Sequence, residues 1–283
     1  MNIFFAYIFY FIAASISPLQ RRWLAVNKNS ENKGQINFAF KTTLIGVVLS
    51  LFFPFFQHFY ITGDIFYLVI LALTCGIFGA GFYIASYIAQ KHVEAGVTQL
   101  VVNIYTPVTI ILAILFLQEG LTFLQIIGTF LLLISMVIVS KKHHIGKLHF
   151  DKYFLLTLLS GVMLAFVLVA ERALVKTTGF AAGTMLSWWS TCLFLGIATL
   201  ITRNKSEYSR KDITITGGLR FLQNLAWVVL VYTVGNLSLV SSVTTFKVVV
   251  MFILGAVFLK EKEDLPRKIL GSVVAVLGLL FMK

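Results

Sequence analysis

The sequence predicts an all-α integral membrane protein with ten transmembrane helices, arranged as two inverted five-helix repeats. Three observations predict this fold class: the composition, the spacing of the apolar segments and a repeat within the chain. Of the 283 residues, 59% are hydrophobic and only 12% are charged, and the mean hydropathy is +0.92. Soluble chains contain about 45–50% apolar and about 25% charged residues. The composition therefore excludes a soluble domain, a coiled coil and a disordered chain.

Ten apolar segments, each bounded by charged or turn residues, are the expected spans. A transmembrane helix needs about 20 apolar residues, and these segments approach that length with short connections between them. Each is expected to be a helix, because backbone polar groups inside a bilayer have no water to bind. In chain order the segments cover residues 2–20, 36–57, 65–90, 96–117, 121–140, 153–174, 182–202, 212–234, 238–259 and 266–282.

Local features add to the description of three of these helices. Residues 1–19 lack the basic start of a signal peptide, so we expect a first span that is retained. Gly76 and Gly79 predict close packing of the third span against a neighbour. Pro107 predicts a kink in the fourth span, which frees a backbone carbonyl for a ligand or a hinge.

Positive charges predict the orientation. Seventeen of the 23 Lys and Arg residues fall in the odd-numbered loops, and only Arg172 and Lys176 fall in the even-numbered loops. Cytoplasmic loops carry this excess, so both termini are expected on the non-cytoplasmic side of the inner membrane. The net charge of +12 then reflects contact with anionic lipid, and no nucleic acid partner is expected. Cys75 and Cys192 lie in apolar spans, which indicates packing residues and no metal site.

A repeat at an offset of 142 residues relates the two halves of the chain. Residues 112–119 align with 254–261, which superposes Glu119 on Glu261, and a glycine follows each glutamate in the next span. Each half holds five spans, an odd number, so the halves must lie in the membrane with opposite orientations. Inverted repeats of this kind are typical of alternating-access carriers. The expected domains are residues 1–142 and 143–283.

The repeated ending Phe-Leu-x-Glu, at 116–119 and 258–261, resembles the EamA-type transporters of the drug/metabolite transporter superfamily. The resemblance covers essentially the whole chain. It implies ten helices, a central substrate cavity between the halves and movement of small metabolites across the inner membrane, often outward. The chain departs from the family pattern in lacking a Trp-Gly pair in the first span and in having Val249 at the position that corresponds to Pro107.

Polar residues at membrane depth indicate where a substrate binds. A charge at the bilayer centre costs about 2.5–3.5 kcal/mol or more, so Lys247 and Arg220 are functional candidates by default. Two cations without an acid at mid-membrane predict an anionic group as their partner. The segment 244–250 also resembles the lysine-containing ninth span of sugar-phosphate and nucleotide-sugar carriers. The expected substrate-binding residues are Lys247, Arg220, Asn103, Tyr105, Gln99, Asn224, Trp227 and Thr244.

Both cations also have purely structural interpretations. Lys247 can simply pack the two halves together, and Arg220 can reach the headgroups or pair with Asp212. Glu119, Glu261 and Pro107 are expected to have gating or structural roles, with each glutamate bonded to a neighbouring helix end. Glu171 is the one acid that can fall inside a span, near its outer end, and no histidine is central. The pattern therefore favours facilitated diffusion or exchange over proton coupling.

The sequence thus predicts a carrier that moves a small polar metabolite by alternating access, as an exporter or exchanger. The metabolite is expected to be anionic or zwitterionic, such as an amino acid or a phosphorylated compound. The chain shows no enzyme motif, so neither enzymatic activity nor a cofactor or metal is expected. Its partners are the substrate and the lipid bilayer, and it is expected to act as a monomer or homodimer. The alternatives are a drug or cation exporter of the same fold and a non-transporting scaffold or flippase subunit.

Overall fold

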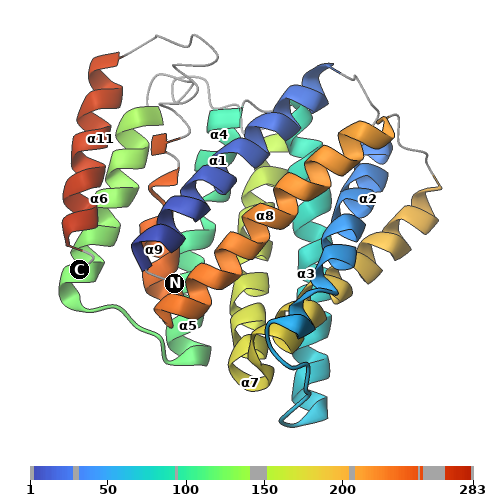
Figure 1. The fold of residues 1–283 in the computed structure, drawn as a ribbon. Coiled ribbons are helices and arrows are strands. Elements are labelled where there is room, and N and C mark those ends of the chain that lie inside the picture. The colour runs from blue at the N-terminus through green and yellow to red at the C-terminus, as the bar shows by residue number, and fades with distance from the viewer. Residues whose placement is uncertain are drawn as a thin grey trace.

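A computed structural model of the chain describes residues 3–27, 32–92, 95–140, 152–203, 208–247, 249–250 and 265–281. Every regular element in these ranges is helical (Figure 1). The elements are α1 (Ile3–Asn27), α2 (Asn32–Ser50), the short 3-10 helix η1 (Phe53–Phe55), α3 (Ile65–His92), α4 (Ala95–Val102), α5 (Tyr105–Leu117), α6 (Phe123–Ser140), α7 (Lys152–Thr202), α8 (Arg210–Val234), α9 (Leu237–Thr244) and α11 (Leu265–Leu280).

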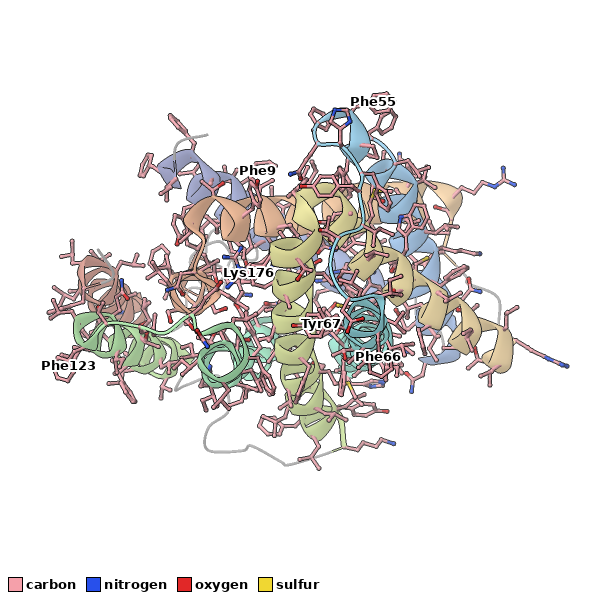
Figure 2. The ribbon with its side chains drawn as sticks, turned by 90° about the horizontal axis from the view of Figure 1, so that it is seen from below. Phe9, Phe55, Phe66, Tyr67, Phe123 and Lys176 are labelled. Carbon is pink, nitrogen blue, oxygen red and sulfur yellow. The ribbon has the colours of Figure 1, made fainter. Side chains whose placement is uncertain are left out.

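Apolar side chains cover the outside of the helices as well as the inside. In the described part of the chain, α1, α3, α7, α8 and the segment Gly34–Phe55 are long and apolar enough to cross a membrane. Phe55 is 83% exposed and Phe123 is 76% exposed, and both project at the rim of the molecule in Figure 2. Lipid tails are the environment in which such a surface is favourable.

The 51-residue α7 contains two spans, because the chain reverses direction inside it. Gly179 adopts φ 83° and ψ 173°, which lies outside helical geometry and suits a residue without a side chain. The indole Nε1 of Trp188 donates to Glu171 Oε1 at 2.9 Å. In a continuous helix, residues seventeen apart would be separated by about 25 Å. Residues 152–178 and 180–202 are therefore two limbs of a hairpin, as the sequence predicts for the sixth and seventh spans.

The hairpin bend and the ends of several helices meet at one end of the molecule, called the bend end below. The backbone amide of Ala181 donates to Gln57 Oε1 at 3.1 Å, so the loop after α2 supplies a cap for the second limb. Thr62 in the same loop donates to the carbonyl of Thr177 at 2.6 Å. The bend end lies at the bottom of Figure 1 and faces the viewer in Figure 2.

The predicted fourth span is broken, but the break lies four residues before the proline. The helix is interrupted at Asn103 and Ile104, between α4 and α5, and Pro107 sits in the first turn of α5. Proline has no N–H for the carbonyl four residues earlier. The amide of Thr106 instead bonds to Asn103 O at 3.0 Å. The same interruption follows α9, at Thr245 and Phe246, although no proline follows it there.

Elements of the two halves begin at matching positions. α4 and α9 each contain eight residues, and they begin 142 residues apart. α6 and α11 also begin 142 residues apart, and they pack against each other at one edge of the molecule (Figure 1). α1 lies against α8 in the same view.

The packing of α3 against α7 depends on small residues. A Cβ atom added at Gly76 would lie within 3.0 Å of the Phe194 ring, and one at Gly79 would meet the Thr191 side chain as closely. The predicted close packing of the third span is therefore present, with the second limb of α7 as the neighbour.

Several residues assigned to loops by the charge pattern lie inside helices, among them Arg21 in α1 and Arg172 and Lys176 in α7. The first limb of α7 continues to Thr178, so it includes Arg172 and Lys176. The apolar run ends near residue 174, but no glycine or proline ends the helix before Gly179. Arg172 is only 8% exposed, which makes the assignment of this residue to an exposed loop wrong.

Candidate functional site

A cavity with a volume of about 120 Å³ lies among α1, α2, α3, α5, both limbs of α7, α8 and residue 247 beyond α9. At 10–15 Å³ for each water, the cavity has room for about ten waters. We call it the central cavity. Its charged lining residues are Arg21, Glu171, Arg220 and Lys247, and its aromatic lining residues are Tyr10, Phe82, Tyr83, Tyr105, Trp188, Phe221 and Trp227.

Arg220 is held at the cavity wall by neutral groups. It is 3% exposed, and its Nη1 donates to Thr42 Oγ1 at 3.3 Å and to Tyr87 Oη at 3.2 Å. Its guanidinium carbon lies 3.3 Å from the centre of the Tyr83 ring, a stacked cation–π contact. Asp212 instead forms the capping box of α8 with Ser209, so it does not neutralise this arginine.

The second terminal nitrogen of Arg220, Nη2, is buried and has no hydrogen-bond partner among the described residues. A buried donor without a partner costs about 1–3 kcal/mol, and more when it is charged. The other terminal nitrogen holds the guanidinium in place, and Arg220 contributes to the cavity wall, so its positive charge acts on a ligand in the cavity. A carboxylate or phosphate oxygen is the strongest acceptor for this group.

Lys247 also reaches the cavity without an acidic partner among the described residues. It is 7% exposed, and its Nζ donates to Tyr105 Oη at 3.3 Å and lies 4.7 Å from the centre of that ring. Tyr105 in turn lies 3.3 Å from Thr244 Oγ1. The two residues that the repeat superposes, Tyr105 and Lys247, are thus in direct contact.

The remaining predicted substrate-binding residues divide into two groups. Asn224 and Trp227 line the central cavity on the same helix as Arg220, and Asn224 Nδ2 donates to Tyr83 Oη at 3.4 Å. Gln99, Asn103 and Thr244 are buried but do not contribute to the described cavity wall. Gln99 lies in α4, Asn103 in the interruption that follows it and Thr244 at the end of α9. Polar groups around these interruptions face other helices: Thr106 of α5 and Thr245, which follows α9, lie 3.1 Å apart.

Glu171 is the principal cavity residue that the sequence interpretation did not include in the binding site, since it placed this acid near the outer end of a span. It lines the central cavity and is 7% exposed. Its neighbour Trp188, also in the cavity wall, donates to it from the second limb of α7. Trp189 points the other way: it is 43% exposed, and its Nε1 bonds to Ser50 Oγ at 3.0 Å. The sequence signal for its position is the absence of a glycine or proline between Gly161 and Gly179, which lets the first limb continue past Glu171 to residue 178.

Glu119 forms a compact ionic cluster at the bend end. Arg172 Nη2 lies 2.9 Å from Glu119 Oε1, and Lys176 Nζ lies 3.3 Å from the same oxygen. The amide of Leu237, the first residue of α9, donates to Glu119 Oε2 at 2.7 Å. Ser238 bonds to the Glu119 carbonyl, and Arg172 bonds to the carbonyl of Gly235.

This cluster, called the Glu119 cluster below, joins both halves of the chain. Glu119 follows α5, whereas its partners belong to α7 and to the start of α9. A carboxylate at the first amides of a helix is favoured by the helix dipole. Figure 2 shows Lys176 near the centre of the bend end, between the helices. The equivalent residue Glu261 lies outside the described residues.

A helical membrane protein with a charged and aromatic cavity at its centre has the architecture of a membrane transporter. Residues 1–141 match the EamA-like transporter family. The chain belongs to this family, which is part of the drug/metabolite transporter superfamily, and it is a multi-pass membrane protein.

The other comparisons concern the fold. Twenty-seven chains of solved structures match. One of them, described as "Crystal structure of protein", is 15% identical with a TM-score of 0.65, and the match covers 98% of this chain and 97% of that one. No curated protein matches. At this identity, the structural likeness concerns the arrangement of helices alone.

Proposed function

We propose that the protein is an inner-membrane carrier that moves a small anionic or zwitterionic metabolite by alternating access, as an exporter or exchanger. The observation that carries the proposal is that Arg220, which has no acidic partner among the described residues, lines the central cavity. A buried guanidinium held only by neutral groups is a site prepared for an anion, because a carboxylate or phosphate would supply both charge and acceptors. Lys247 and Arg21 add further positive charges to the same cavity.

The carrier mechanism rests on two inverted repeats, residues 1–142 and 143–283, which together provide ten spans. The matching starts of α4 and α9 and of α6 and α11 support this division. The division of α7 into two limbs at Gly179 supplies the sixth and seventh spans. The repeated interruption at residues 103–104 and 245–246 provides two bends near the cavity, where discontinuous helices of carriers commonly hold substrate.

The Glu119 cluster is proposed as the gate on the non-cytoplasmic side. The charge distribution of the loops assigns the bend end, and with it both termini, to that side. Because the cluster ties the end of α5 to α7 and to α9, opening a path through this end requires its ion pairs to separate.

A second candidate function, export of an aromatic or cationic compound, is favoured by one observation. The central cavity also contains Glu171, beside Trp188 and several other aromatic side chains. A carboxylate with aromatic rings can bind an organic cation. The positive charges of Arg220 and Lys247 oppose such a ligand, so the two candidates differ in the sign of the substrate that is moved.

Counterflow in proteoliposomes tests the proposal. We expect liposomes loaded with the correct compound from a panel of amino acids, sugar phosphates and aromatic cations to take up its radiolabelled form. Lys247→Ala should lower the initial rate for the anionic or zwitterionic compound about tenfold, the equivalent of about 1.4 kcal/mol of binding energy. Because alanine is apolar and smaller than lysine, the substitution can also destabilise the fold. The thermal stability of each variant is therefore measured in parallel.

Each other outcome has a distinct meaning. Equal transport by the wild type and Lys247→Ala removes the lysine from the site. Counterflow of the cations alone supports the second candidate function. Absence of counterflow across the panel, with folded protein, favours a scaffold or flippase subunit.

A further inference from the structure

Glu171 is a buried acid for which the proposed anion site gives no role. The residue is 7% exposed, and its Oε1 accepts a hydrogen bond from the Trp188 indole at 2.9 Å. Within the described residues no lysine or arginine forms an ion pair with it. The adjacent Arg172 is occupied by Glu119 instead. Glu171 therefore has no direct ionic partner among the described residues, although Arg21, Arg220 and Lys247 line the same cavity.

An ionised carboxylate removed from water costs several kcal/mol unless a cation or several donors compensate it. The Ser187 hydroxyl and the Trp188 indole are neutral donors, and they are a weak compensation for a full negative charge. The smallest cation that can satisfy the group is a proton, and adding one requires no extra space in the wall. Acids inside membrane proteins commonly mark proton pathways for this reason.

The position of Glu171 fits a group that exchanges protons with water. It lines the central cavity, and it also lines a second, small cavity of about 10 Å³ between α7 and α8. That volume corresponds to about one water. Arg172, a member of the Glu119 cluster, lines the small cavity as well. Glu171 thus lies between the proposed substrate site and the proposed gate.

Charged and titratable groups face these two cavities from all the contributing helices except α2, which supplies Thr42, Thr43 and Gly46. Tyr10 and Arg21 come from α1, Tyr83 from α3 and Tyr105 from α5, and Lys247 follows α9. Arg220 and Tyr232 come from α8, and Cys75 of α3 lies close enough to interact electrostatically with Glu171. The titratable neighbours of Glu171 on its own helix are Arg172 and Lys176. Glu171 is the one acidic side chain among the described residues of either cavity wall.

We propose that Glu171 is the proton-binding site of the central cavity and that its protonation is coupled to substrate movement. The proposal rests on the proposed function and replaces the expectation, drawn from the sequence, of transport without proton coupling. A proton adds to a carboxylate oxygen and leaves from it again, and no bond to the substrate forms. Because an anionic substrate and an ionised Glu171 repel each other in one cavity, binding of the anion and of the proton favour each other. Proton and anion therefore move in the same direction.

Infrared difference spectroscopy tests proton binding without any substrate. Wild-type protein in liposomes, compared between alkaline and acidic buffer, should show the C=O stretching band of a buried protonated carboxyl. Glu171→Gln should lack this band, whereas Asp64→Asn, which changes an exposed acid outside the cavity, should retain it. A band of unchanged intensity in Glu171→Gln overturns the proposal, as does its absence from the wild type.

A transport experiment tests the coupling. For one proton per substrate, a gradient of one pH unit supports accumulation of at most about tenfold. We expect the wild type to accumulate the counterflow substrate when such a gradient is imposed, and Glu171→Gln to exchange it without responding to the gradient. Wild-type counterflow that is indifferent to pH, or accumulation by Glu171→Gln equal to that of the wild type, overturns the coupling alone. Absence of wild-type counterflow across the panel would instead overturn the proposed function.

Discussion

Replacing Glu119 with leucine is expected to lower the free energy of unfolding by about 3–5 kcal/mol, the cost of removing one partner from a buried ion pair. Arg172 would keep its buried charge with only the Gly235 carbonyl as a strong partner. The first amide of α9 would also lose its acceptor, because Leu237 donates to the same carboxylate. Thermal unfolding of the purified protein in detergent measures the effect.

A double variant separates charge from packing. Glu119→Leu together with Arg172→Met removes both charges, so it should be more stable than Glu119→Leu alone, with a coupling energy of about 0.5–3 kcal/mol. Lys176→Gln is the matched control: its side chain is 45% exposed, and an exposed pair contributes at most about 1 kcal/mol. Equal stability of the wild type and Glu119→Leu would mean that the cluster does not hold the two halves together.

Replacing Arg220 with methionine is expected to lower the initial rate of counterflow at least about 30-fold, the equivalent of about 2 kcal/mol. Methionine has a similar length but offers neither the charge nor the guanidinium donors. Arg220→Lys should recover only part of the rate, because an ammonium cannot stack on Tyr83 and reach Tyr87 in the same planar geometry.

The control for Arg220 lies on the same helix. Arg210→Met removes an exposed arginine from the first turn of α8 and should leave the rate unchanged. If Arg220→Met, once shown to be folded, transports as fast as the wild type, the arginine serves only to tie α8 to α2 and α3 through Thr42 and Tyr87.

The sequence predicts the helices better than it predicts the site. Apolar length and charged ends place the start of each described span within a few residues, since the bilayer imposes both. The ends agree less well: α1 continues to Asn27, past the predicted end at residue 20. Lys247 and Arg220 stand out in apolar surroundings for the same reason. Gln99 and Asn103 do not contribute to the cavity wall. The helix is interrupted at residues 103 and 104, so the face of α4 does not continue into α5, and Tyr105 of α5 lines the cavity instead.

Glu171 shows why the rest of the site could not be predicted. Its sequence neighbours Arg172 and Lys176 suggest a polar loop, and only the tertiary structure shows that Glu119 neutralises Arg172. The pairing of Glu171 with Trp188 depends on the reversal of the chain at Gly179. No local pattern encodes such contacts between distant segments.

The central claim is that the cavity around Arg220 opens in turn to the two sides of the membrane. Cys75 and Cys192, which are both buried, are replaced by alanine to give a background without cysteines. A single cysteine is then introduced at Asn224, which lines the cavity. A membrane-impermeant thiol reagent is applied from either side of oriented vesicles. Asp64→Cys and Arg210→Cys calibrate the two sides, and Ile111→Cys, on the exposed apolar surface, is the unreactive control.

We predict that the cysteine at position 224 reacts from both sides, and that the counterflow substrate slows both reactions. Labelling from neither side, with all three reference variants behaving as expected, would contradict alternating access to this cavity.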